Sequence, residues 1–570
     1  MTDQRNLILA IVLSALIMLG FQLFFEKPQP VAPQQTTTAP AGAPTSDVPT
    51  PRGPGEVPSA SPASAKASRD AALAEAPRIR IETPHLHGSL ALKGGRIDDL
   101  TLAGYRQEAA PTSPEIVLLS PPSAPDPYYA EVGWVPEGDA VKVPGPDTLW
   151  RAEGGPLTPT SPVTLRWDNG QGLRFVRVVS VDSDYMFTIT QRVENTGSAP
   201  VTLYPYALVS RTGTPKTEGF YILHEGPLGV LDGTLTEIKY DGLREERVRE
   251  KATTGGWIGI TDKYWLTAVV PDQTAEVKAR FSHRMVGDRD KYQTDLLGGA
   301  REIAPGATAE VTSHVFAGAK KVALLDGYEE KFGVKRFDLA IDFGWFYFLT
   351  KPFFYFLQFL NTALGNFGLA ILAFTVAIKA VLFPLANKSY QAMSKMKKLQ
   401  PEVQKLQQRF GDDKARLNQE LMALYKREKA NPVSGCLPVL VQIPIFFALY
   451  KVLFVTIEMR HAPFYGWIHD LSAPDPTTVA NLFGLIPWTP PAFLMIGVWP
   501  LIMGATMFLQ QKLNPQPTDP VQAKMFLFLP IVFTFLLASF PAGLVIYWAW
   551  SNTLSIIQQW VIMRKMGVKP

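Results

Sequence analysis

A lysine lies inside a hydrophobic segment of the last third of the chain. Residues 366–384, NFGLAILAFTVAIKAVLFP, are long enough to cross a bilayer and carry one charge, that of Lys379. A cation near the centre of a membrane span costs roughly 2.5 to 3.5 kcal/mol, and such groups usually face a bundle interior or a wet cavity. Lys379 is also five positions before Pro384, so snorkelling of its ammonium to the headgroup region explains this segment equally well.

Polar side chains recur in three further hydrophobic segments. In the last of them Ser551, Ser555 and Gln558 follow a helical spacing of i, i+4 and i+7, with Asn552 and Gln559 beside them. Each such residue alone is typical of packing between membrane helices. Together with the lysine they predict a hydrated groove. The candidate groove residues are Lys379, Gln442, Thr506, Gln510, Ser551, Asn552, Ser555 and Gln558.

The types of residue in these segments exclude several chemistries. All seven histidines lie outside them, so a Ser-His protease has no base there, and the spans lack the Asp and Glu of proton-coupled transporters. His85 and His87 occupy alternate positions of a predicted strand without a third ligand, which favours surface histidines over a metal site. We therefore expect no catalytic residues, no cofactor and no metal. The cation remains available to an incoming anion.

Composition indicates a membrane protein with a soluble middle part. The chain has 570 residues, 46% hydrophobic and 19% charged, and its apolar residues concentrate near the N-terminus and in the last third. The net charge of +4 is too small to indicate nucleic-acid binding. The single cysteine, Cys436, cannot form an intramolecular disulfide.

The first 77 residues predict an anchor and a tether. Residues 7–25 are uncharged and follow Arg5, which is typical of a transmembrane anchor within residues 1–27; a cleaved signal peptide is the alternative. Residues 28–77 are rich in Pro, Ala, Ser and Thr, a composition that predicts a disordered linker.

The middle of the chain has the period of β-strands. Apolar and polar residues alternate in 78–82, 163–167, 173–179 and 185–193, and turn signals occur at 168–170 and 195–197. Residues 78–325 therefore predict an extracytoplasmic all-β sandwich.

The rest of the chain predicts alternating spans and loops. Residues 337–365 are aromatic and are interrupted by Lys351-Pro352, which favours a short amphipathic helix after Pro352 on the outer interface; lengthening of the next span is the alternative. Residues 386–431 carry eleven Lys and Arg against five Asp and Glu, with helical stripes around Gly411, and predict a cytoplasmic helical hairpin, either a docking segment or a solvated structural one. Five spans follow the anchor, at 366–385, 433–457, 493–511, 524–540 and 544–563, with an outer loop at 458–491 and inner segments at 512–523 and 564–570.

Five sequence stretches carry a resemblance to a known family. They are GNFGLAILAFTVAIKAVLFPL (365–385), LQPEVQKLQQRFGDDK (399–414), NPVSGCLPVLVQIPIFFALY (431–450), WIHDLSAPDP (467–476) and FPAGLVIYWAWSN (540–552). With the order of parts, they resemble the YidC membrane protein insertase family of Gram-negative bacteria. The resemblance runs almost continuously from residue 337 to 566, whereas the β domain and the linker are similar mainly in position and type.

The resemblance implies the architecture and the site. It implies a multi-pass α-helical membrane protein with six transmembrane helices, five of them forming an insertase core, an all-β supersandwich-like external domain and a cytoplasmic hairpin that receives substrates. Its groove cation corresponds to Lys379, where many members have arginine, so this chain offers a point charge in place of a bidentate donor. The short tail lacks the basic ribosome-binding extension of some relatives. The implied apolar slide consists of Pro438, Ile443, Phe446, Phe447, Pro530 and Phe533.

The expected function is that of a non-enzymatic membrane protein insertase and folding chaperone, acting alone or with the Sec translocon. Implied partners are nascent membrane proteins, the Sec translocon, ribosome–nascent chain complexes and the lipid bilayer, and the expected state is a monomer in the bacterial inner membrane with both termini cytoplasmic. Two other classes stay open at this point. A small-solute transporter would show solute flux in vesicles, and a membrane-anchored periplasmic glycan-binding protein would keep its activity on unrelated spans.

Overall fold

The computed structural model describes most of the chain after the linker. The described residues are 68–138, 140–219, 223–410, 413–428, 437–484, 486, 488, 490–491, 495–514 and 520–567. The predicted anchor at 1–27 and most of the predicted linker lie outside them.

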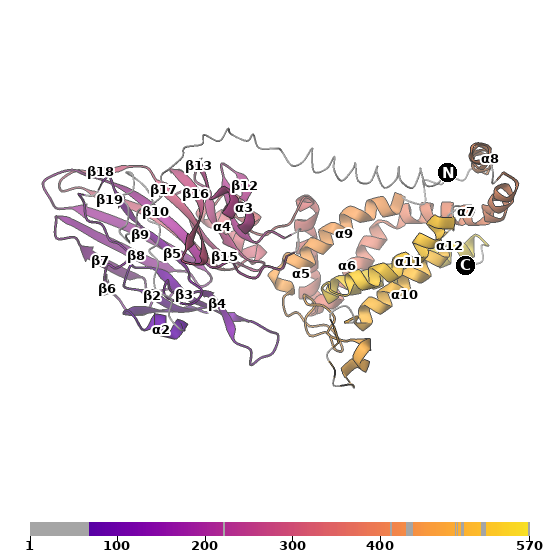
Figure 1. The fold of residues 1–570 in the computed structure, drawn as a ribbon, viewed down its shortest axis with the longest axis horizontal. Coiled ribbons are helices and arrows are strands. Elements are labelled where there is room, and N and C mark those ends of the chain that lie inside the picture. Colours follow the sequence, from indigo (N-terminus) through magenta and orange to yellow (C-terminus); the bar gives the residue numbers. More distant parts are fainter. Residues whose placement is uncertain are drawn as a thin grey trace, which may run out of the picture. The chain divides into compact units, whose positions relative to one another are not determined.

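Two antiparallel sheets form the all-β domain (Figure 1). The ten-stranded sheet has the order β1 (Arg78–Glu82), β2 (Leu86–Ala91), β3 (Ile97–Arg106), β5 (Tyr128–Pro136), β10 (Val201–Thr212), β17 (Arg289–Gly298), β16 (Glu276–Val286) and β13 (Val248–Thr254), with β4 (Glu115–Leu119) beside β3 and β18 (Arg301–Ile303) beside β10. The nine-stranded sheet has the order β12 (Thr234–Glu237), β11 (Gly226–Leu231), β14 (Trp257–Thr261), β15 (Trp265–Val270), β19 (Thr308–Ala319), β9 (Met186–Asn195), β8 (Leu173–Val181), β7 (Val163–Asp168) and β6 (Arg151–Glu153). Their facing side chains share one hydrophobic core, which confirms the predicted sandwich.

Local side-chain chemistry sets the turns between strands. Asn169, between β7 and β8, accepts hydrogen bonds through Oδ1 from the backbone N–H groups of Gln171 at 2.7 Å and Leu173 at 3.0 Å. Gly170 has a φ of +71°, a conformation that a residue with a Cβ rarely adopts. The predicted turn at 168–170 is confirmed, and β1 has the predicted bounds.

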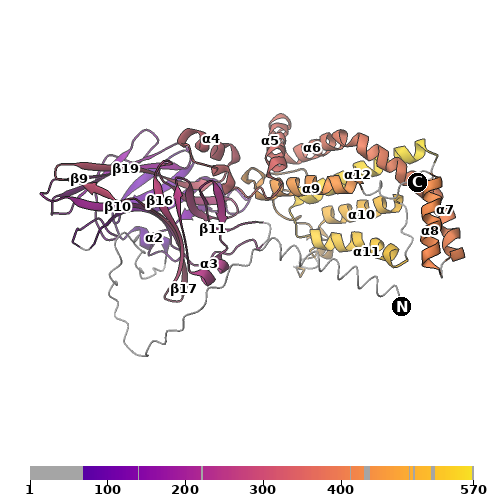
Figure 2. The same ribbon diagram turned by 90° about the horizontal axis from the view of Figure 1, so that it is seen from above.

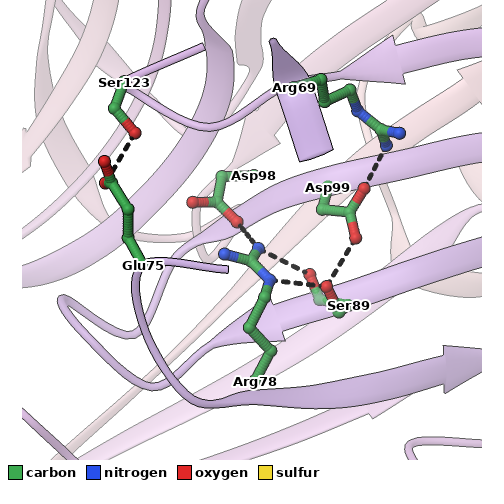
Figure 3. A network of polar contacts seen from close by, with 7 residues as sticks. All are labelled: Arg69, Glu75, Arg78, Ser89, Asp98, Asp99 and Ser123. Carbon is green, nitrogen blue, oxygen red and sulfur yellow. Dashed lines mark hydrogen bonds and ion pairs between the residues drawn. The ribbon is translucent and has the colours of Figure 1, made fainter. Parts of the chain in front are cut away.

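The end of the predicted linker is ordered (Figure 3). Helix α2 (Arg69–Leu73) begins at the N-cap Ser68 and is held to the ten-stranded sheet by an ion pair between Arg69 and Asp99. Glu75 accepts a hydrogen bond from Ser123 at 2.8 Å. The prediction of disorder through residue 77 is therefore wrong for residues 68–77, because the ion pair of Arg69, the hydrogen bond of Glu75 and the burial of Ala72 hold this stretch to the domain.

A buried histidine makes the stability of the β domain sensitive to pH. Burial lowers the pKa of His224 to about 4, although its Nε2 lies 3.1 Å from the carbonyl oxygen of Pro227. The unfolded chain therefore binds a proton at a higher pH than the folded domain does. The contribution of neutral His224 to the unfolding free energy is fully present above the ordinary pKa of 6.5 and declines as the pH falls towards 4.

We expect His224→Gln to flatten this dependence. The variant keeps an N–H donor near Pro227 without a titrating ring. Between pH 6.5 and 4 the unmodified protein should lose up to about 3 kcal/mol more unfolding free energy than the variant. Denaturant unfolding followed by tryptophan fluorescence at several pH values measures both slopes, and parallel slopes would contradict the expectation.

The C-terminal part of the chain is helical. Its elements, with the short helix α3 (Tyr240–Glu246) of the β domain, are α4 (Val322–Phe332), η1 (Phe337–Ala340), α5 (Tyr347–Leu364), α6 (Phe367–Val381), α7 (Phe383–Phe410), α8 (Lys414–Arg427), α9 (Leu437–Val455), η3 (Ile457–Met459), η4 (Val479–Gly484), α10 (Val498–Leu513), α11 (Pro520–Leu537) and α12 (Ala542–Lys565). Figure 2 shows α9, α10, α11 and α12 running alongside one another. Helix α12 packs against α6, α7, α9 and α10 and is the central helix of this part.

Helix α5 begins earlier than predicted. It runs continuously from Tyr347 through Pro352, so the prediction of a short helix that starts after Pro352 is wrong. Pro352 is the sixth residue of the helix, where it removes a single backbone bond. Lys351, in the same turn, compensates for this lost hydrogen bond, because its ammonium binds Asp326 of α4 at 2.8 Å and Asp338 of η1 at 3.1 Å.

A bend separates the helix of the groove lysine from the next helix. Helices α6 and α7 meet at an angle of 69°, and Pro384 is the second residue of α7. The apolar stripes of α7 and α8 then pack together through Leu399, Val403, Leu421 and Leu424, and Asp413 caps the N-terminus of α8. Among the described residues no single helix has the length and hydropathy of a full membrane span; the α6–α7 pair reaches them jointly, and 441–455 and 522–537 are shorter apolar segments.

Candidate substrate groove

The ammonium of Lys379 points to the central helix. It is half-buried on α6, and its Nζ donates a hydrogen bond to Ser555 Oγ of α12 at 2.7 Å. In the described part of the chain no carboxylate pairs with it. The cation is therefore held by a neutral partner, and an ion pair with an anion remains open to it.

The polar stripe of α12 contacts two other helices. Ser551, Asn552 and Ser555 are buried. Gln442 of α9 approaches Ser551 Oγ through Nε2 at 3.4 Å, and Asn552 Nδ2 approaches Thr506 Oγ1 of α10 at 3.4 Å. These are long hydrogen bonds, so they join the helices weakly.

Two predicted groove residues are less closely engaged. Gln558 is half-buried, and its amide nitrogen has no hydrogen-bond partner among the described residues. Gln510 is half-buried one turn after Thr506. The structure thus brings six of the eight predicted residues into contact in three groups, Lys379 with Ser555, Gln442 with Ser551, and Thr506 with Asn552.

Two residues outside the candidate set also lie in this region. Gln559 is buried on α12 and donates from Nε2 to Asn514 Oδ1 at 3.1 Å. Tyr390 is buried near the start of α7, and its phenol is a neighbour of Ser555. Gln559 lies beside the polar stripe that the sequence predicts on α12, whereas Tyr390 has no signal in the sequence because the bend at Pro384 brings it to α12.

Two residues of the predicted apolar slide pack against a tryptophan that the sequence analysis does not name. The ring of Trp548 on α12 lies 4.8 Å from that of Phe446 on α9 and 5.6 Å from that of Phe533 on α11. Ile443 and Phe447 are exposed on α9, and Pro530 is buried in α11, where its carbonyl accepts a hydrogen bond from Thr534 at 2.8 Å. The side chain of Pro438 is not among those that the structure describes.

Helix α11 presents a broad apolar face. Its exposed residues are Met525, Phe526, Leu527, Phe528, Leu529, Ile531, Val532, Phe535 and Leu536. An apolar surface of this kind requires a lipid or protein partner.

Among the described residues there is no group of three or more His, Cys, Asp or Glu side chains placed to hold a metal ion.

Comparisons with known proteins identify the family. The family model of the YidC periplasmic domain matches residues 78–356, and that of the 60Kd inner membrane protein matches residues 359–569. The chain is 52% identical to the membrane protein insertase YidC of Methylorubrum extorquens, over 100% of this chain and 96% of that protein. It is 53% identical to that of Methylobacterium nodulans over the same shares.

A solved structure is also similar. It is an active YidC insertase with its first transmembrane domain resolved, with a TM-score of 0.34 and 16% identity over 84% of this chain and 91% of that chain. The two family matches and the full-length relatives together show that the chain belongs to the YidC family of non-enzymatic inner-membrane protein insertases.

Proposed function

We propose that this chain inserts nascent membrane proteins through a groove formed by Lys379 and the polar face of α12. The observation that carries the proposal is the neutral partner of the lysine, since Ser555 leaves the positive charge uncompensated within the described residues. An acidic group in the translocated tail of a substrate supplies the missing negative charge. Because the site is partly desolvated, that attraction is stronger than it would be in water.

The apolar residues around Trp548 form the second half of the proposed path. Phe446 and Phe533 contact this ring from two different helices. A guest helix then meets polar groups on one side and an apolar wall on the other, and its hydrophobic residues pass along that wall into lipid.

The topology that we propose has six crossings. The anchor and the five C-terminal spans place the β domain in the periplasm and both termini in the cytoplasm. The excess of Lys and Arg in residues 386–431 supports a cytoplasmic α7–α8 hairpin. The proposed partners are nascent membrane proteins, delivered from ribosome–nascent chain complexes or beside the Sec translocon to a monomeric insertase.

Site-specific photocrosslinking tests the path. A crosslinking amino acid at Gln442 or Phe533 should capture a stalled nascent membrane protein. Ile557 is the control position, because it is exposed on α12, two residues beyond Ser555. Equal crosslinking at all three positions, or none at Gln442 with a stalled substrate that later inserts, would overturn the proposal.

A further inference from the structure

The hydroxyl group of Ser555 is committed to two partners at once. The side chain is 3% exposed, and its Oγ donates to the backbone oxygen of Ser551 one turn earlier at 2.9 Å. A hydroxyl has one proton and two acceptor lone pairs. With the proton directed along the helix, the lone pairs are left to face Lys379, whose ammonium donates to Oγ at 2.7 Å.

The same serine joins three helices. Lys379 binds it from α6, and the phenol of Tyr390 is its neighbour from α7. Tyr390 and Ser555 are both buried, so the lysine's partner has a fixed place and little freedom to rotate. A long, flexible lysine side chain is thereby directed towards α12, although its length would also allow it to extend elsewhere.

We propose that Ser555 is a positioning residue that holds the Lys379 ammonium in the groove until an acidic group of the substrate replaces the serine hydroxyl as its partner. This inference rests on the proposed function of the groove. A neutral hydroxyl suits this role, because a carboxylate binds an ammonium more strongly than a hydroxyl does and can replace it. A carboxylate at position 555 would instead compensate the charge permanently.

The chain offers a matched control on the same helix. Thr553 also donates its hydroxyl to a backbone oxygen one turn earlier, that of Ala549, at 2.8 Å. This bond lies within α12. Thr553→Ala therefore removes the same kind of hydrogen bond as Ser555→Ala while keeping the partner of Lys379. Ser555→Thr is the conservative variant, since threonine retains a hydroxyl that can bond to the preceding turn.

The first measurement follows the lysine itself. Full-length protein in lipid vesicles is treated with a water-soluble amine-acylating reagent, and modification of Lys379 is quantified by mass spectrometry. Loss of a hydrogen bond to the charged amine should speed modification in Ser555→Ala on the order of tenfold. In Ser555→Thr and Thr553→Ala, Lys379 should be modified at the same rate as in the unsubstituted protein. An unchanged rate in Ser555→Ala, or an equal increase in Thr553→Ala, would overturn the inference.

The second measurement separates this inference from the function on which it rests. Insertion is compared for two substrates that differ only in the charge of their tails, and Ser555→Ala should narrow the preference for the acidic tail while Thr553→Ala leaves it intact. If Lys379→Ala inserts both substrates normally, the proposed function fails whatever the labelling shows. If Lys379→Ala fails and Ser555→Ala leaves labelling unchanged, only the positioning role fails. Should Ser555→Ala not accumulate, Ser555→Cys replaces it, because a thiol is a weak acceptor of similar size.

Discussion

Insertion of substrates with acidic tails should be lost in Lys379→Ala and Lys379→Glu and retained in Lys379→Arg. Two unit charges 4 Å apart attract by about 1 kcal/mol in water and about 4 kcal/mol at an effective dielectric constant of 20. If the attraction acts in the rate-limiting step, its loss slows insertion roughly fivefold to several hundredfold. Glutamate should be the worse replacement, because it repels the acidic tail.

Reconstituted vesicles and the paired substrates measure this effect at matched protein levels. Lys405→Ala is the charge-matched control, because Lys405 is an exposed cation of α7. Snorkelling predicts another result, in which Lys379→Ala removes a cost from the span and leaves insertion unchanged. Insertion of both substrates by Lys379→Ala at the rates of the unsubstituted protein would therefore refute the groove role of the lysine. The bond from Lys379 to Ser555 favours the groove, since the ammonium is directed to another helix.

Periodicity predicted the elements whose burial repeats along the chain. The bounds of β1 and the turn at Asn169 follow from alternation and local hydrogen bonds, which are properties of adjacent residues. The polar stripe of α12 is of the same kind, since Ser551 and Ser555 lie one turn apart on a single helix. For these features the sequence distance between partners is short.

Features that depend on distant partners could not be predicted in this way. The order of α2 depends on the ion pair of Arg69 with Asp99, thirty residues away. Trp548 looks like any aromatic residue of a span until α9 and α11 pack against it. Likewise, the sequence marks Lys379 and Ser555 as polar but does not pair them, because 176 residues separate them.

Helix α5 shows why a local rule can fail. Lys351-Pro352 has the appearance of a break when it is considered alone. In the structure the ammonium of Lys351 binds Asp326 of α4 and Asp338 of η1. The hydroxyl of Tyr347 also donates a hydrogen bond to Asp338, and that of Tyr355 donates one to Asp326. The charges that seemed to interrupt the helix are the groups that attach it to the end of the β domain.

This attachment sets the limit of a tolerated truncation. Deleting residues 78–319 removes the strands and should leave insertion of simple substrates intact, because the described β domain contributes no groove residue and α4 and η1 are retained. Extending the deletion through residue 345 should impair insertion strongly, because α5 then loses both carboxylates that bind Lys351. Complementation of a depleted strain measures both truncations, with expression and membrane integration verified.

A substitution in the full-length chain separates the attachment from the deleted mass. Asp338 is 3% exposed, and Lys351→Met removes its ammonium partner while Arg336 at 3.8 Å and the hydroxyl of Tyr347 remain, so we expect a cost on the order of 1 to 3 kcal/mol. Lys351→Met with Asp326→Asn and Asp338→Asn removes the charges together and should recover part of that stability. We expect Lys351→Met to reduce insertion as the longer deletion does, and the triple variant to be less impaired. Full complementation by the longer deletion would show that α5 keeps its place without Asp326 and Asp338.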